Sequence, residues 1–279
     1  MEQNYLAQIQ ALIDQKYKDD PEALQNKKDE DLIELAKSFK SKKDLTQIKK
    51  AIEEGADPNS LDDDEQSLLY IALIQVKSIE LAKLLVEGGT EIDNGIIEEA
   101  IAHRSSESLK FLIDEGADVK SRNFLHAASN LHAVDIIRVL VEAGVDINKR
   151  DSNGMTALHA SCESKHISSA TETLIELGAD VNARDSRGET PMHRARGVKH
   201  MMALIEAGAD VNARTNGNST PLHKAASRGD IEAGKLLISN KADINAKNED
   251  GLTPIQVAYA LGNAEFIKNI INETGGEMA

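Results

Sequence analysis

Two short motifs recur along this 279-residue chain at a spacing that constrains its fold more than any other feature. The first begins at Thr156, Thr190, Thr220 and Thr253 and reads TALHA, TPMHRA, TPLHKA and TPIQVA, in steps of 34, 30 and 33 residues. The second is a glycine turn, which begins at Gly55, Gly116, Gly144, Gly178 and Gly208 and reads GADPN, GADVK, GVDIN, GADVN and GADVN. Such a period indicates an array of units, each too thin to bury its own apolar side.

The copy from Ser219 to Ala246 indicates how one unit is built. Thr220 is a hydroxyl helix cap, and Pro221 takes the first helical position, where its missing N–H is not needed. Gly229 and Asp230 break the chain and cap a second helix, whose apolar residues recur at helical spacing. The sequence therefore predicts two short helices back to back, followed by an extended connection.

A period near 33 residues with T-P-L-H and G-A-D-V-N motifs resembles the ankyrin repeat family. The resemblance covers residues 31–274 and implies an all-α solenoid of about eight helix-turn-helix units with short β-hairpin connections. In that family the hairpin tips and first helices form the concave face that holds partners. The last unit ends the stack, and residues 275–279 are expected to form a disordered tail.

Residues 1–30 lie outside the repeat pattern. Leu6, Ile9, Ile13 and Tyr17 follow helical spacing, which predicts a helix that ends before Pro21. Residues 22–28 are expected to form another short turn. We interpret this segment as an N-terminal helical cap over the end of the stack. The alternative is an amphipathic helix that docks on a partner or pairs with its own copy.

Two connections should be shorter than the others. Gly89, Gly116 and Gly144 close successive units only 27 and 28 residues apart, whereas a full unit needs about 33. The helices of these units look complete, so the deficit must fall in the connections. We predict stunted hairpins before repeats three and four, full-length hairpins before repeats five, seven and eight, and an abbreviated joint between the helices of repeat six, at residues 196–200.

Composition limits the function classes. The formal net charge of −15 argues against general binding to nucleic acid or to an acidic membrane. One cysteine leaves no disulfide framework and fits a reducing compartment. The chain shows no signal core and no membrane-spanning run. We expect a cytoplasmic monomer without cofactor or metal, located in the host cytoplasm if the protein is an effector.

The histidines and the cysteine that could take part in catalysis or metal binding are better explained by structural roles. His126, His159, His193 and His223 lie one repeat apart, about 10 Å by helix packing, which is too far for a shared zinc ion. In the ankyrin family this histidine bonds loop backbone in its own and the adjacent repeat. Cys162 stands where the family has a small buried alanine, which predicts an inert thiol. No catalytic motif is present, so no enzyme is predicted.

Basic residues crowd repeats six and seven of an otherwise acidic chain. One hypothesis is a positive patch whose arginine forks hold carboxylates or phosphates of a partner. The other is a solvated face balanced by Asp185, Glu189, Asp210 and Asp230. Exchanging Arg194 and Lys224 for glutamate should then weaken partner binding and leave thermal stability nearly unchanged. The predicted partner-binding residues are Arg187, Arg194, Arg196, Lys224, Arg228, Met155 and Glu163.

Two further surface features have structural and functional interpretations. The acidic run Asp62 to Glu65 is either a solvated loop or a second surface of opposite sign. Asn182 and Asn212 match the position at which asparagine is hydroxylated in some ankyrin proteins, and their structural interpretation is that they tie down the hairpins.

We interpret the chain as a non-catalytic scaffold that binds a partner protein through its concave face, around repeats five to seven. The partner would carry an acidic or phosphorylated segment, and the shortened hairpins would leave a dip that selects its shape. The alternative is a bacterial effector with ankyrin repeats that binds and modulates a host protein. An enzyme would require a deep pocket with clustered titrating groups.

Overall fold

The computed structural model describes residues 15–17, 20–163 and 169–273. Most of the helix predicted through Leu6, Ile9 and Ile13 lies outside these residues, as do the tail predicted at residues 275–279 and residues 164–168 of repeat five. Among the described residues, no helix is both long enough and apolar enough to cross a lipid bilayer.

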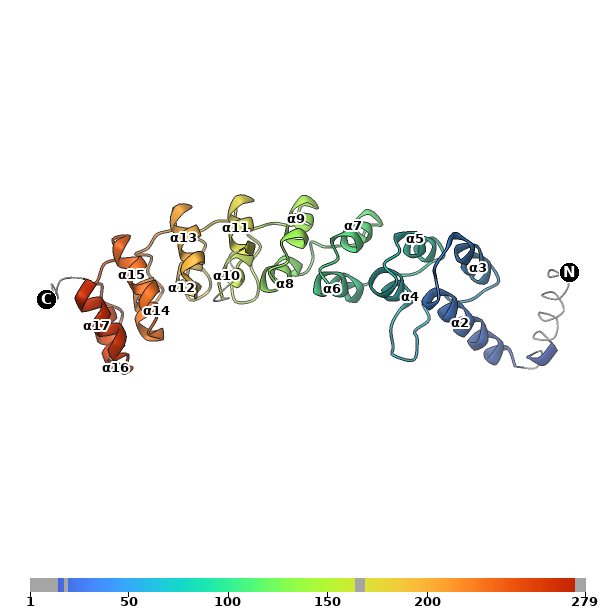
Figure 1. The fold of residues 1–279 in the computed structure, drawn as a ribbon, viewed down its shortest axis with the longest axis horizontal. Helices are drawn as coiled ribbons and strands as arrows, with labels where there is room; N and C mark the ends of the chain where they lie inside the picture. The colour runs from blue at the N-terminus through green and yellow to red at the C-terminus, as the bar shows by residue number, and fades with distance from the viewer. Residues whose placement is uncertain (1–14, 18–19, 164–168, 274–279) are drawn as a thin grey trace. The chain divides into compact units, whose positions relative to one another are not determined.

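The described chain is all-α and consists of paired helices (Figure 1). The first helices of the pairs are α2 (Pro21–Lys37), α4 (Leu68–Tyr70) continued by the π-helix η1 (Ile71–Gln75), α6 (Asn94–Ala102), α8 (Phe124–Asn130), α10 (Ala157–Ser161), α12 (Pro191–Arg194), α14 (Pro221–Arg228) and α16 (Pro254–Ala260). The second helices are α3 (Lys42–Glu53), α5 (Ile79–Glu87), α7 (Ser106–Asp114), α9 (Val134–Glu142), α11 (Ser169–Glu176), α13 (Val198–Glu206), α15 (Ile231–Ser239) and α17 (Ala264–Glu273). The predicted helix-turn-helix solenoid is confirmed.

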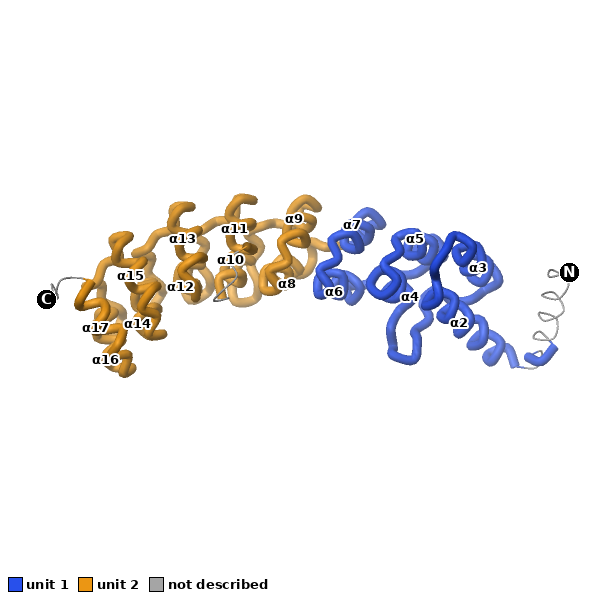
Figure 2. The backbone as a smooth tube through the Cα atoms, viewed as in Figure 1, with its two compact units in different colours: residues 1–117 blue, residues 118–279 orange. Residues whose placement is uncertain are grey.

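Contacts divide the chain into two compact units, coloured separately in Figure 2. Unit 1 is Met1–Ala117 and holds repeats one to three, from α2 to α7. Within it α2 packs on α3 and η1, α3 packs on α5, and α4 packs on α6. Unit 2 is Asp118–Ala279 and holds repeats four to eight, from α8 to α17.

Unit 2 is built as two rows of helices. The first helices α8, α10, α12, α14 and α16 each contact the next in their row, and the second helices α9, α11, α13, α15 and α17 do the same (Figure 1). Leu174, Leu204 and Leu237, one from each of three successive second helices, are fully buried in these contacts. Each repeat therefore completes the core of its neighbour, as a solenoid requires.

The connections from each second helix to the next first helix, which we call fingers, differ in length as predicted. The finger before repeat three is residues 88–93, and the one before repeat four is residues 115–123. Those before repeats five to eight are longer: residues 143–156, 177–190, 207–220 and 240–253. The finger before repeat two, residues 54–67, is also long and is seen beside α4 in Figure 1.

The fingers are turns and not strands. Among the described residues no β-strand is formed, and the isolated antiparallel bridge between Leu61 and Ser67 is the nearest approach to the predicted β-hairpins. Successive long fingers are joined by single backbone hydrogen bonds, from Ser186 N–H to the Asn153 carbonyl and from Asn216 N–H to the Arg187 carbonyl. One bond per finger pair is too few to make a ladder.

The start of repeat one differs from the expectation. Residues 22–28 do not form a separate turn, because α2 runs without a break from Pro21 to Lys37. Asp20 caps this helix by accepting a hydrogen bond from Ala23 N–H, and Pro21 takes its first position. The aspartate and proline that were predicted to end one helix therefore begin another. The abbreviated repeat six is confirmed, because α12 has one turn and only residues 195–197 separate it from α13.

Candidate functional site

The histidines of the T-P-L-H motif connect neighbouring repeats. Nδ1 of His193 accepts a hydrogen bond from Thr190 N–H at 3.1 Å, which closes the start of α12. Its Nε2 donates to the Ser219 carbonyl of the next repeat at 3.1 Å. His159 and His223 make the same pair of contacts, and Nε2 of His126 lies 2.8 Å from the Met155 carbonyl. The structural interpretation of these histidines is confirmed.

Burial keeps the imidazoles of His159, His193 and His223 neutral. It lowers the pKa of His193 to about 4, and burial also lowers the pKa of His159 and of His223 below the usual value. A neutral ring is what the geometry needs, since one nitrogen accepts and the other donates. Within the described ranges no cluster of three or more histidine, cysteine or acidic residues is arranged to hold a metal ion.

Cys162 is fully buried at the end of α10, as predicted. Burial raises the pKa of its thiol to about 12, so the nucleophilic thiolate is not populated at neutral pH. Its sulfur lies 3.9 Å from Oγ1 of Thr171, which also contacts Nδ1 of His200 and Oγ of Ser161, at 2.8 Å each. This is a buried polar cluster that joins repeats five and six.

Asn182 and Asn212 have the predicted structural contacts. Oδ1 of Asn182 accepts from Asp210 N–H at 2.9 Å, and its amide donates to the Gly208 carbonyl at 3.3 Å. Asn212 repeats the pattern with Asp243 N–H and the Lys241 carbonyl. Each asparagine therefore ties its finger to the next one.

Three of the predicted partner-binding residues, Glu163, Arg194 and Lys224, belong to an internal ion-pair network. The Arg194 guanidinium lies 3.0 Å from Glu163, 2.9 Å from Asp185 and 2.8 Å from Glu189. Lys224 Nζ reaches the other oxygen of Glu189 at 2.5 Å. The side chains of Asp185 and Glu189 are 1% and 8% exposed, so the two basic residues neutralise nearly buried carboxylates of repeat six.

The electrostatics of the network agree with its geometry. Burial acts to raise the pKa of Asp185, but the hydrogen bonds from Arg194 and from the backbone N–H groups of Glu189 and Arg187, with the charge of Arg194, together outweigh burial and lower the pKa. Glu189 behaves in the same way, with Lys224 supplying the main opposing interaction. The pKa of Arg194 is raised despite its burial, because Asp185 and Glu189 surround it. Asp185, Glu189 and Arg194 therefore stay charged at neutral pH.

This network overturns the expectation that glutamate at positions 194 and 224 would leave thermal stability nearly unchanged. Such a variant would place two new carboxylates against Asp185 and Glu189, which are already almost out of contact with water. Like charges at this depth are strongly unfavourable. Loss of binding by that variant would therefore report loss of structure.

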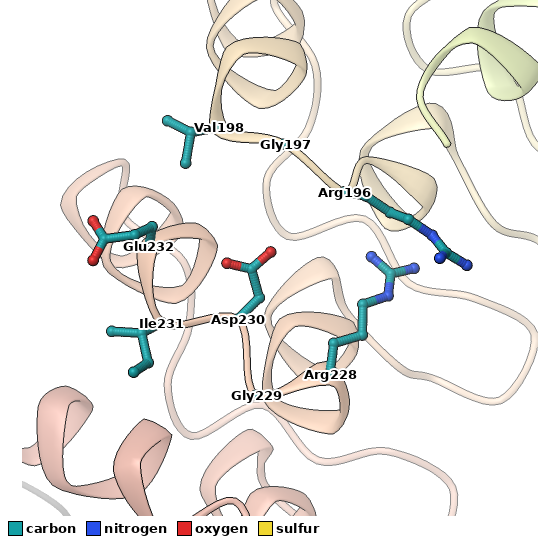
Figure 3. Close-up of a pocket in the computed structure, with 8 residues that line it drawn as sticks. All are labelled: Arg196, Gly197, Val198, Arg228, Gly229, Asp230, Ile231 and Glu232. Atoms are coloured by element: carbon teal, nitrogen blue, oxygen red, sulfur yellow. The ribbon is translucent and has the colours of Figure 1, made fainter. Parts of the chain in front are cut away.

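A second group, Arg196 and Arg228, borders a cavity of about 650 Å³ (Figure 3). Arg228 lies at the end of α14 and donates to the carbonyls of His193 at 2.9 Å and Ala195 at 3.0 Å, so it closes the exposed end of α12. Burial lowers its pKa, and the charge of Arg196 lowers it further. In Figure 3 the side chains of the two arginines approach each other across the cavity.

Acidic groups border the same cavity from the next helix. Asp230 faces Arg228 in Figure 3 and accepts from Ala233 N–H as the cap of α15, and Glu232 follows it. The cavity thus combines two arginines with two carboxylates around an apolar wall of Val198 and Ile231. The sequence predicted the Gly229-Asp230 cap of this second helix, and the structure confirms it, but Asp230 and Glu232 were not among the predicted partner-binding residues.

The remaining predicted residues do not join one cluster. Arg187 is exposed in the finger before repeat six, where its backbone N–H donates to Asp185. Met155 is half-buried in the finger before repeat five, and its carbonyl contacts His126. Glu163 is exposed and pairs with Arg194. Among the described residues, no hydrogen bond or ion pair holds the side chains of Arg187 and Arg196.

Comparison with known proteins agrees with this geometry. A family model described as "Ankyrin repeats (3 copies)" matches residues 124–215, and one described as "Ankyrin repeats (many copies)" matches residues 204–258. The chain is similar to an ankyrin repeat protein of Rickettsia bellii (strain RML369-C), with 33% identity over 106 residues that cover 33% of this chain and 59% of the relative. It is also similar to an ankyrin repeat protein of Fowlpox virus (strain NVSL), with 30% identity over 116 residues that cover 39% of this chain and 21% of the relative. The matches thus span less than two thirds of either relative.

Proposed function

We propose, from the premise that this chain belongs to the ankyrin repeat family, that it binds one partner protein through the fingers and first helices of repeats five to seven. Protein binding in general follows from the repeats, which are typically non-catalytic. The location and the partner are our proposal. The partner segment is acidic or phosphorylated, and the reducing cytoplasm is the compartment that the single buried cysteine fits.

The observation that best supports this proposal is that some basic side chains have partners within the chain and others do not. We call the first group committed and the second uncommitted. Arg194 and Lys224 are held by carboxylates of repeats five and six, and the guanidinium of Arg228 by backbone carbonyls of repeat six. Arg187 and Arg196 are exposed and have no such partner among the described residues. An uncommitted guanidinium on a rigid element can form a bidentate contact to a carboxylate or phosphate at low entropic cost.

The test uses Arg187→Gln and Arg196→Gln, because neither change disturbs the buried ion pairs. Labelled peptides with runs of glutamate or with phosphoserine are titrated against the full chain. We expect each variant to weaken binding several-fold and the double variant about tenfold or more, the range measured for loss of charge-assisted contacts. The control is Arg138→Gln on α9, whose guanidinium pairs with Glu176 on the row of second helices. Binding that falls equally in the control, or in no variant, would contradict the proposal.

The effector function is the second candidate, and the similarity to a Rickettsia bellii protein favours it. In that case the partner is a protein of a host cell. A translocation reporter fused to the chain and assayed during infection tests this. If the reporter stays within the bacteria while the chain still binds the acidic peptides, the effector function is contradicted and the scaffold function is not.

A further inference from the structure

The finger before repeat two, residues 54–67, departs from the later fingers at one position. The tip of this finger is the tight turn of residues 62–65, and the tips of the later fingers are the matching turns that begin at Asp151, Asp185, Thr215 and Asn248. The residue directly before the tip is Leu61 in repeat two, but it is basic in repeats five to eight, where it is Arg150, Arg184, Arg214 and Lys247. Arg184 and Arg214 each donate to a backbone carbonyl of the following finger, at 2.7 and 3.1 Å. Leu61 cannot make this contact, and 56% of its surface is exposed.

The same finger lacks a partner for a backbone group that later fingers use. In repeats six, seven and eight the second residue of the tip donates its N–H to the preceding finger, as Ser186 does to Asn153. Asp63 holds this position in repeat two. Its N–H has no acceptor among the described residues, and no finger precedes repeat one, which begins with the helix α2.

A groove of about 500 Å³ lies between α2 and this finger. Ile33 and Leu61 supply its apolar surface, and Glu30, Glu34 and Asp63 line its exposed acidic side. Lys37 does not offset this charge, because its Nζ lies 2.8 Å from Oδ2 of Asp62, whose side chain is 1% exposed. We refer to this feature as the α2 groove.

We propose that the α2 groove docks a basic amphipathic segment of a partner protein. Apolar side chains of that segment cover Leu61 and Ile33, and its lysines or arginines meet Glu30, Glu34 and Asp63. A backbone carbonyl of the same segment accepts from Asp63 N–H, which is the contact that a preceding finger would make. Burial of the exposed leucine supplies affinity, and the acidic side selects the sign of the partner.

Charge complementarity decides between the candidate occupants. Residues 1–14 of this chain carry Glu2 and Asp14 and no lysine or arginine, so they do not complement the groove. A second copy is also disfavoured, since the formal net charge of the chain is −15. The α2 groove contains none of the arginines of repeats five to seven. It attracts a basic segment, whereas those arginines attract an acidic one.

The proposal is tested on the full chain with a labelled helical peptide that carries leucines on one face and lysines on the other. The test variant is the triple substitution Glu30→Gln, Glu34→Gln and Asp63→Asn. The control is Glu142→Gln, Glu206→Gln and Glu265→Gln, three exposed carboxylates of unit 2 with the same total change in charge. We expect the groove variant to weaken binding at least tenfold and the control less than twofold.

A second variant separates docking from general attraction to an acidic protein. Leu61→Arg introduces the residue type that later fingers carry, so the thermal melting temperature should stay within the range of the control. Binding of the leucine-bearing peptide to Leu61→Arg should be about tenfold weaker or more than to the unmodified chain. A peptide with serines in place of the leucines should bind neither the unmodified chain nor Leu61→Arg. Equal binding by the groove and control variants, or full binding by Leu61→Arg, would overturn the proposal.

Discussion

At the scale of single residues, the buried histidines couple stability to pH. His159, His193 and His223 are neutral in the folded protein, with a pKa below the ordinary value of 6.5. Below pH 6.5 the unfolded chain binds protons that the folded chain does not, so the free energy of unfolding falls as the pH falls. The shift of His193 to about 4 corresponds to roughly 3 kcal/mol lost between these two pH values.

The first prediction is that His193→Gln flattens this pH dependence. Repeat eight carries Gln256 at the same position, where Oε1 accepts from Thr253 N–H at 2.9 Å, so glutamine can keep the helix cap. Denaturant titrations at a series of pH values between 6.5 and 4.5 should show a slope lower by close to one proton. The lowered pKa values of Asp185 and Glu189 add their own loss only at lower pH, as those carboxylates protonate. An unchanged slope would mean that His193 does not carry the coupling.

Glu65 is the residue with a left-handed backbone at the tip of the repeat-two finger, with φ of 59°. The fingers of repeats five, six and eight have Gly154, Gly188 and Gly251 there, with φ of 75°, 73° and 72°. A side chain in this conformation is strained by about 1 kcal/mol relative to glycine.

The second prediction is that Glu65→Gly stabilises unit 1 slightly, by up to about 0.6 kcal/mol, which is the strain energy less the added entropy of the unfolded chain. Chemical denaturation would measure it. Glu65→Ala removes the same carboxylate but keeps a Cβ, so it should give no gain. Equal stabilisation by both substitutions would assign the effect to charge and not to backbone strain.

At the scale of elements, the ion pairs of Arg194 and Lys224 together join repeats five, six and seven. The arginine starts in α12 and reaches Glu163 at the end of α10, while Lys224 of α14 reaches Glu189. The network therefore ties successive first helices together. Its contribution to stability depends on the burial of Asp185, which would lose its main counter-charge without Arg194.

The third prediction compares Arg194→Met with Lys224→Met. Removing Arg194 leaves two nearly buried carboxylates facing each other and should destabilise unit 2 by about 2–3 kcal/mol. Removing Lys224 should cost less than about 1 kcal/mol, because Arg194 remains beside Glu189. Chemical denaturation followed by circular dichroism measures both. Adding Glu189→Gln to Arg194→Met should restore part of the loss, and equal effects of the two single variants would refute this account.

At the scale of the whole molecule, stability is expected to be local, because among the described residues the helices in extensive contact belong to the same repeat or to adjacent repeats. Gly234 of α15 shows how tightly such neighbours pack. A Cβ at this position would lie 2.7 Å from Cε2 of Phe266 and 3.0 Å from Cδ1 of Ile270, both on α17. The phenylalanine is 1% exposed and has little room to move.

The fourth prediction is that Gly234→Ala destabilises repeats seven and eight selectively. Overpacking typically costs about 1–3 kcal/mol, and the offset from better helix propensity is at most about 1 kcal/mol. Hydrogen exchange should show faster opening of α15 and α17 and unchanged protection in unit 1. Uniform loss of protection along the chain would indicate global cooperativity. Gly95→Ala on α6, where a Cβ comes no nearer than 3.3 Å to any neighbouring atom, serves as the control.

Periodicity was sufficient to predict the paired helices and the stunted fingers, and the resemblance to the ankyrin family added the solenoid and the role of the motif histidines. These features depend on spacing along the chain, and a repeated unit carries its local geometry with it. The continuous α2 was missed, because Asp20 and Pro21 end one helix or begin another with equal ease. The sequence placed the candidate arginines in particular repeats, but it did not predict which side chains they pair with inside the protein.

The sequence by itself determined the thin helical modules, their order and the positions of their caps, since propensity, capping and period act over a few residues. Only the tertiary structure decided which charges remain for another protein. Arg194 and Lys224 pair with carboxylates, while in the described part of the chain no hydrogen bond or ion pair holds the side chain of Arg196. The physical reason is that ion pairing depends on distances of a few ångströms between side chains of different repeats, which spacing along the chain does not specify.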